Sequence, residues 1–432
     1  MKARRAQGAR AAGASRAPSE TLVGQLEQRL LVLVTLALVA FGLVMVYSAT
    51  SAAAALGNGD PITSLRRQGI YALLGVALMV VASRFDHRRL RILAPPLVLA
   101  ALGLCIAVLL VAPEINGAKR WLTAGPLTFQ PSELAKLALL LWVAAYLARK
   151  GAPRTLGELW KPIGMLTCLF AALIVIEPDL GTTISLLLMV GGMLVVAGMP
   201  GRTIGGAAAI ATIGGLAAIW MEPYRRARIF SFLDPWSDPE DSGFQTVQAL
   251  IGIGSGGVTG KGLGEGVQKI NYLPEQQTDM ILAVIGEELG LIGTTAVIAA
   301  FAAFAFAGFT VALRCRDPFG KLLAAGVTSL VCGQAAVNLA AVLGVAPLTG
   351  IPLPFVSYGG SSLVVLLASV GILLNIATDE RAPQSIGGRG AAGADRRRRN
   401  GRARPAVARS RGGAARPRRQ RDVRRVAGSG RG

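Results

Sequence analysis

The sequence predicts an all-α integral membrane protein with about ten transmembrane helices. Hydrophobic residues make up 52% of the 432 positions, charged residues only 16%, and the mean hydropathy is +0.52. Crossing the ~30 Å hydrocarbon layer takes about 20 residues of helix, and apolar runs near that length recur along the chain. One long hydrophilic stretch, residues 221–278, interrupts them between the seventh and the eighth run. We expect this stretch to form a large extracytoplasmic loop.

The ten apolar runs are the predicted helices. They cover residues 30–47, 68–82, 92–112, 132–147, 162–176, 180–197, 203–220, 279–313, 322–343 and 361–376. The first is longer than the apolar core of a usual signal peptide and is interpreted as an uncleaved signal anchor. The eighth is long enough to tilt or to project past the bilayer.

The distribution of lysine and arginine predicts the orientation. With the N-terminus inside, the short cytoplasmic loops (84–91, 149–161, Arg202 and 314–321) hold 12 positive residues, and the short outer loops (48–67, 113–131 and 344–360) hold four. Positive residues concentrate in cytoplasmic loops. An even number of spans then places both basic termini in the cytoplasm.

Three parts are expected: a basic, flexible N-terminus (1–29), a ten-helix membrane domain (30–378) and a disordered Arg-rich tail (379–432). Residues 381–432 hold 17 arginines against two aspartates, Asp395 and Asp422, with few apolar residues to bury. The net charge of +21 comes largely from such segments. Because the tail is predicted to be cytoplasmic, anionic lipid or a cytoplasmic partner is its expected contact, and no nucleic acid is expected.

Histidine and cysteine chemistry is disfavoured. His87 is the only histidine and lies in a predicted cytoplasmic loop, and the four cysteines have no metal-ligand spacing. Ionisable residues in or beside apolar runs are costly to bury, so they mark candidate sites. The candidates are Glu133, Lys136, Glu177, Asp179, Asp279, Glu287 and Glu288.

The first candidates are Glu133 and Lys136, which follow Pro131 at the start of the fourth run. Spacing i,i+3 puts both charges on one helix face. Two interpretations remain open: an internal salt bridge between spans, or a polar pocket whose lysine attracts phosphate. Lys119, Arg120 and Trp121 lie just upstream, and the tryptophan is also typical of the aromatic belt.

The long loop carries an arginine run, residues 224–228, and glycine-rich segments at 252–257 and 260–264. Glycine-rich backbone can approach phosphate closely, but flexible turns explain such runs as well. The spacing is not that of a nucleotide-binding loop.

Asp279 ends this loop and opens the eighth run. A carboxylate there could act as a general base towards a lipid-borne substrate, or it could be a helix N-cap or an acidic residue of the first helical turn. Glu287 and Glu288, two to three turns further on, are interpreted as partners of Lys136 or of backbone. Near the last run, two prolines and two glycines in 352–360 predict broken, re-entrant backbone.

These segments together resemble the SEDS family of bacterial cell-wall proteins (shape, elongation, division and sporulation). Within it they are more similar to FtsW than to RodA. The resemblance extends from about residue 30 to residue 378. It rests on Gly117–Trp121, Gln130–Lys136, Glu177–Thr182, Tyr224–Trp236, Gly243–Gly264, Tyr272–Gly290 and Pro352–Ser362.

The resemblance implies a peptidoglycan glycosyltransferase of the division machinery that polymerises lipid II in the cytoplasmic membrane, at the septum. It implies a class B penicillin-binding protein and other division proteins as partners, and Mg²⁺ or Mn²⁺ as a cofactor. Asp279 corresponds to the essential carboxylate of the family. The expected substrate-binding residues are Lys119, Arg120, Trp121, Gln130, Ser132, Glu133, Lys136, Arg225, Arg226, Ser357, Tyr358, Gly359 and Gly360.

The expected chemistry needs one base. The donor's leaving group is a diphosphate, so it needs no protonation, and positive charge suffices to stabilise it. We expect Asp279 to take the acceptor's hydroxyl proton, with inversion to a β-1,4 strand, while Lys119, Arg120, Lys136 or a divalent ion stabilises the diphosphate. A lipid II flippase is the alternative, for which essential charges near the bilayer midplane would be expected. A non-catalytic division scaffold is a third possibility.

Overall fold

The computed structural model describes residues 18–55, 61–114, 117–124, 127–241, 243–269 and 276–379. The predicted flexible N-terminus up to residue 17 and the Arg-rich tail from residue 380 lie outside these residues. Ten of the described helices are long and apolar enough to span a membrane. They coincide with the ten predicted runs, so the predicted fold class is confirmed.

The helices follow one another with a single small sheet between them. Their bounds are α2 (Pro18–Ala55), α3 (Pro61–Arg84), α4 (His87–Val111), α5 (Pro131–Lys150), α6 (Leu156–Leu159), the π-helical turn η1 (Trp160–Gly164), α7 (Met165–Ile176), α8 (Leu180–Ala197), α9 (Gly201–Trp220), α10 (Pro223–Leu233), α11 (Phe244–Gly256), α12 (Ile281–Arg314), α13 (Pro318–Val342) and α14 (Gly360–Asp379). A hairpin of β1 (Leu122–Ala124) and β2 (Leu127–Phe129) joins α4 to α5, with Thr123 opposite Thr128.

Local signals set several helix boundaries. Pro131 begins α5, where the missing N–H of proline leaves no bond unmade, and Gly151 ends it with a positive φ of 81°. Asp179 caps α8 by accepting from the backbone N of Thr182, and Asp317 caps α13 in the same way through Gly320.

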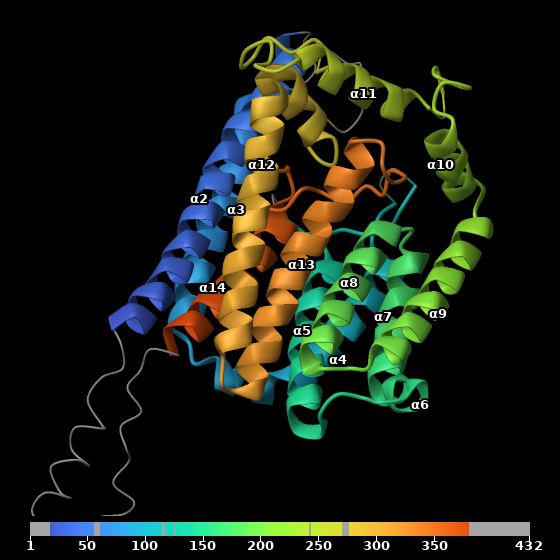
Figure 1. The fold of residues 1–432 in the computed structure, drawn as a ribbon. Helices are drawn as coiled ribbons and strands as arrows, with labels where there is room; N and C mark the ends of the chain where they lie inside the picture. The colour runs from blue at the N-terminus through green and yellow to red at the C-terminus, as the bar shows by residue number, and fades with distance from the viewer. Residues whose placement is uncertain are drawn as a thin grey trace, which may run out of the picture. The chain divides into compact units, whose positions relative to one another are not determined.

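The centre of the bundle is formed by α5, α13 and α14. The most apolar window of α14 is 83% buried inside the protein, against 6% for α9 at the edge. Figure 1 shows α13 between α12 and the α5–α8 pair, and α14 behind α12, where it packs along α3. The functional candidates Glu133, Lys136 and Gly360 therefore lie on the innermost helices.

The segment between α9 and α12 is not a simple irregular loop. It contains α10 and α11, which Figure 1 draws at one end of the bundle. Residues 257–262 then dock on a break in α12. Gly290 breaks this helix with φ 64° and ψ −157°, and a Cβ at this position would also meet the carbonyl of Val258 at 2.6 Å. The break lets the backbone N–H of Leu291 bond to the Gly257 carbonyl at 2.9 Å.

Candidate functional site

Asp279 lies in the turn that leads into α12. Its side chain is 9% exposed, and Thr278 Oγ1 donates to Asp279 Oδ1 at 3.2 Å. The N-cap of α12 is Met280, which makes no side-chain capping bond. Asp279 thus precedes the cap position, and the interpretation of this residue as the cap of α12 is wrong.

Two amides on α13 hold the backbone around Asp279. The side-chain nitrogen Nδ2 of Asn338 donates to Asp279 O at 2.8 Å and to Ile351 O at 2.7 Å. Since both partners are carbonyl oxygens, the amide group can face them only with its NH₂. One turn earlier, Gln334 Nε2 donates to Pro352 O at 3.0 Å. Consecutive turns of α13 therefore fix consecutive carbonyls of residues 351 and 352.

Lys136 is connected to these amides through Gln334. Its Nζ is 2.9 Å from Glu133 Oε1 and 3.3 Å from Gln334 Oε1, and both charged side chains are buried. The salt bridge lies within α5 rather than between spans. Through Gln334 it reaches α13 and residue 352, so the structure brings Glu133, Lys136 and the 352–360 segment together. Ser132 Oγ is buried beside them without a hydrogen-bond partner among the described residues.

The segment from 351 to 359 is non-helical backbone buried in protein, as predicted. Phe355 has a φ of 66°, and Leu353, Phe355 and Ser357 are buried. Ser357 Oγ accepts from Leu353 N at 2.8 Å, and the backbone N of Tyr358 donates to Gln277 O at 2.8 Å. These bonds join the segment to the turn that carries Asp279.

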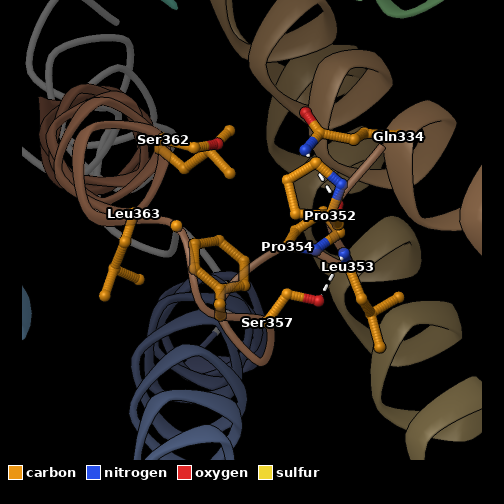
Figure 2. A pocket seen from close by; sticks show the side chains of 10 residues that line it. Gln334, Pro352, Leu353, Pro354, Ser357, Ser362 and Leu363 are labelled. Carbon is orange, nitrogen blue, oxygen red and sulfur yellow. Dashed lines mark hydrogen bonds between the residues drawn. The ribbon is translucent and has the colours of Figure 1, made fainter. Parts of the chain in front are cut away.

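A small pocket opens between this segment, α13 and α14. Its lining includes Gln334, Pro352, Ser357, Gly359 and Ser362, and Figure 2 shows Gln334 and Ser357 on either side of the prolines. Ser362 Oγ is buried and has no hydrogen-bond partner among the described residues. Predicted site residues Ser357 and Gly359 are therefore pocket-lining, and Gly360 begins α14 beside them.

Arg120 binds the turn between the C-terminus of α7 and the N-terminus of α8. Its Nε donates to Glu177 O at 2.7 Å and its Nη2 to Pro178 O at 2.5 Å. Gln130 Nε2 donates to Asp179 Oδ2 at 3.1 Å. Predicted site residues Arg120 and Gln130 are thus bonded to the 177–179 turn, whereas Lys119 is exposed and Trp121 half-buried.

Glu177 in this turn is fully buried, and neither carboxylate oxygen has a hydrogen-bond partner among the described residues. Burial raises its pKa to about 8, and the neighbouring carboxylate of Asp179 adds to the shift, while Arg120 opposes it. A carboxyl group of this kind binds its proton near neutral pH.

The three arginines of α10 point to different partners. Arg225 donates to Ala218 O at 3.0 Å and to Val175 O at 2.8 Å, and the Arg226 guanidinium lies 6.0 Å from the Trp220 ring centre. Arg228, which was not among the predicted site residues, donates to Leu348 O at 3.2 Å. Of the three, the predicted residues Arg225 and Arg226 are bonded to or stacked on the ends of α7 and α9, and Arg228 extends towards Asp279.

Glu287 and Glu288 were interpreted as partners of Lys136 or of backbone. Their lysine partners are Lys261, 2.8 Å from Glu287, and Lys269, 2.8 Å from Glu288. The proposed pairing with Lys136 is therefore wrong, and the backbone interpretation is confirmed for Glu287, which accepts from the N–H groups of Val267 and Gln268.

The glycine-rich run has its N–H groups turned to protein. Lys261 N donates to Glu287 O and Gly262 N to Glu288 O, each at 3.0 Å, and Gly260 N to Gly256 O at 2.9 Å. These donors do not form an anion cradle. Glycine instead lets the backbone of this segment approach α12 closely, because a Cβ on Gly256 would lie 2.0 Å from Gly286 O.

The described residues bear on the expected Mg²⁺ or Mn²⁺ only through their carboxylates. Among the described residues, no three histidine, cysteine, aspartate or glutamate side chains gather in a metal-binding arrangement. Mg²⁺ is often held by one or two carboxylates together with substrate phosphates, so a divalent ion that binds with the diphosphate of the substrate stays a prediction.

Comparison with known proteins identifies the family. Residues 28–382 match the cell cycle protein family of FtsW, RodA and SpoVE. A probable peptidoglycan glycosyltransferase FtsW of Geobacter metallireducens is 43% identical over 81% of this chain and 94% of its own length. One from Nitrosococcus halophilus is 40% identical over 81% of this chain and 91% of its own.

Solved structures agree. A chain from a study of how a peptidoglycan synthase complex coordinates polymerization and crosslinking has a TM-score of 0.68 and 36% identity, covering 82% of this chain and 98% of that one. The rod shape determining protein RodA of Thermus thermophilus has a TM-score of 0.60 and 32% identity, over 82% of this chain and 97% of its own. The expected resemblance is therefore confirmed, and this chain belongs to the FtsW/RodA/SpoVE family of multi-pass membrane proteins.

Proposed function

We propose that this protein is a peptidoglycan glycosyltransferase that polymerises lipid II into β-1,4-linked glycan strands during cell division. The observation that carries the proposal is Asp279, a carboxylate just before the membrane-spanning helix α12. The buried amides of Asn338 and Gln334 on α13 connect the backbone near it to Lys136. The FtsW relatives, named as probable peptidoglycan glycosyltransferases, support the same activity.

In the proposed reaction the acceptor's sugar hydroxyl attacks the donor's anomeric carbon. The hydroxyl oxygen forms the new C–O bond, and its proton passes to the Asp279 carboxylate. The bond between the anomeric carbon and the diphosphate oxygen breaks, and its electron pair leaves with undecaprenyl diphosphate. General base catalysis of this kind contributes about 10²–10⁴-fold. Attack from the side opposite the leaving group inverts the anomeric carbon.

Asp279 is well placed for a lipid-borne substrate because it lies where a loop meets a membrane helix. Its backbone is fixed by Asn338, and preorganisation of this kind reduces the reorganisation needed at the moment of reaction. In this proposal the buried pair Glu133 and Lys136 positions Gln334, and through it the backbone of Pro352.

Partners and location follow from the same proposal. The structural neighbour from a complex that coordinates polymerization and crosslinking supports a class B penicillin-binding protein as the partner. The excess of positive residues in alternate loops supports cytoplasmic termini in the bacterial inner membrane, and the FtsW relatives support a place at the septum. The Arg-rich tail would contact anionic lipid on the cytoplasmic face.

Polymerisation of lipid II by the purified protein tests the activity. Wild-type protein in lipid nanodiscs, alone and with its penicillin-binding partner, is expected to produce glycan strands. Transfer of labelled lipid II across vesicle membranes without strand formation would favour the flippase instead. If neither activity is detected, the non-catalytic division scaffold is the favoured alternative.

A further inference from the structure

Gly350 lies beside both a carboxylate and a guanidinium. A Cβ built on this glycine would lie 3.9 Å from Arg228 Nη1 and 3.9 Å from Asp279 Oδ2. No other atom of the described residues lies within 4 Å of that point, apart from Gly350 and its chain neighbours. The point is thus about 1 Å beyond hydrogen-bond distance from each group.

The backbone conformation at Gly350 favours glycine at this position. Its φ of 71° is a conformation that residues with a Cβ rarely adopt. Any other residue would be strained here and would place a methyl or larger group within contact distance of both side chains. Glycine therefore leaves room for a substrate atom.

Arg228 is held in place from two sides. Its Nη1 donates to Leu348 O at 3.2 Å, and its guanidinium lies 4.8 Å from the centre of the Tyr224 ring. A guanidinium has five N–H donors in a planar fork that matches phosphate oxygens. Among the described residues, Leu348 O is the hydrogen-bond acceptor that the structure gives it, so the fork retains donors for a ligand.

The other cations near the site are bonded differently. Arg120 donates to the carbonyls of Glu177 and Pro178, and Lys136 is paired with Glu133. Within the described part of the chain, Arg228 is the cation that lies with Asp279 within 4 Å of the Cβ position at Gly350.

We infer that Arg228 is a catalytic residue that binds the diphosphate of the lipid donor across Gly350 from Asp279. This inference rests on the proposed function and adds the electrophilic partner of the base. When the anomeric C–O bond breaks, the electron pair stays on the diphosphate oxygen, and Arg228 stabilises that charge while Asp279 receives the proton of the acceptor hydroxyl. Both groups then act on one reaction centre from opposite sides.

The test compares Arg228→Gln, Arg228→Lys and wild type in nanodiscs, with Arg202→Gln as control. Arg202 is an exposed arginine at the first turn of α9. We measure kcat and KM for lipid II and inhibition by added undecaprenyl diphosphate. For Arg228→Gln we expect kcat to fall about 10²–10³-fold, as for the loss of one transition-state donor, and product inhibition to weaken. Arg228→Lys keeps the positive charge without the planar set of N–H donors, so its kcat should fall less. The Arg202→Gln control should match wild type.

Thermal unfolding checks that each variant is folded. If Arg228→Gln does not fold, Arg228→Lys decides: unchanged kcat together with unchanged product inhibition overturns the inference. Wild-type kcat and inhibition in a folded Arg228→Gln overturn it as well. Failure of the wild type to polymerise lipid II would instead contradict the proposed function, so the two failures are distinguishable.

Discussion

Acidic residues near the start of α12 fall into two groups with opposite surroundings. Glu287 and Glu288 are fully buried and saturated: Glu287 accepts from Lys261 and two backbone N–H groups, and Glu288 from Lys269 and Ser48. Asp279, just before α12, is 9% exposed; its Oδ1 accepts from Thr278, and its Oδ2 lies 3.9 Å from the Cβ position at Gly350, which Arg228 Nη1 also approaches to 3.9 Å. Carboxylates paired with lysines hold structure together, whereas the carboxylate beside Gly350 and Arg228 is the one proposed to exchange a proton with a substrate.

The largest effect on stability is expected from Glu288→Ala. Removing this carboxylate leaves Lys269, which is 2% exposed, as an uncompensated buried charge, and breaking such a pair typically costs about 3–5 kcal/mol. Thermal and denaturant unfolding in detergent measure the change. Glu240→Ala, at an exposed position, is the control, and a loss for Glu288→Ala no greater than the control's would contradict the anchoring role.

Asn338→Asp tests whether the backbone of Asp279 must be held in place for catalysis. The substitution keeps the shape but replaces the NH₂ that bonds Asp279 O and Ile351 O, so Asp279 loses its fixed position. We expect kcat to fall about 10–100-fold, corresponding to the ~1–3 kcal/mol of an unsatisfied buried group, while KM for lipid II changes little. Asn375→Asp, in which the altered amide bonds Ser83 O, is the matched control for stability. Equal losses of kcat in both variants would argue against a positioning role.

Glu177 provides a pH-dependent test of a third buried carboxyl. Its pKa rises from an ordinary 4.5 to about 8 in the folded protein. Between these values the folded state binds more protons than the unfolded state, so stability falls with rising pH, by at most about 1.4 kcal/mol per unit. Glu177→Gln should flatten this dependence and raise stability at alkaline pH relative to wild type. Melting temperatures from about pH 5 to pH 9 test this, and parallel curves would refute it.

The smallest effect is expected at the surface. Arg88 and Asp379 form an ion pair of 2.6 Å, but their side chains are 58% and 37% exposed. Exposed pairs contribute about 0–1 kcal/mol, so Arg88→Ala should change the free energy of unfolding by less than about 0.5 kcal/mol. A loss of unfolding free energy comparable to that of Glu288→Ala would show that burial does not determine how much an ion pair contributes to stability.

The fold was predictable because a membrane-spanning run is a local property. Twenty apolar residues form a helix whatever their neighbours, so all ten spans could be located from the sequence. The two short helices α10 and α11 were not predicted, because their stretch is hydrophilic and their positions depend on tertiary contacts such as Arg225 with Val175.

The site was predictable only where a charge interrupts or borders an apolar run. Asp279 and Lys136 stand out in this way, but uncharged Gln334 and Asn338 lie in α13 without any local signal. Asn338 reaches Asp279 across 59 positions of sequence. The pairing of Glu287 and Glu288 with lysines 19 to 26 positions away was likewise hidden, since charges alone do not reveal which partners meet. The sequence signal that could have found Arg228 is its place in the arginine run 224–228, three positions after Arg225.

The central claim is that Asp279 is the base of a glycan polymerase, and Asp279→Asn tests it most directly. The amide keeps the size of the side chain but cannot accept the hydroxyl proton at neutral pH. Lipid II polymerisation by the purified variant and wild type, with unfolding temperatures measured in parallel, separates loss of chemistry from loss of fold. We expect glycan strands from wild type and none from a folded Asp279→Asn protein. Strands formed by the folded variant at the wild-type rate would contradict the claim.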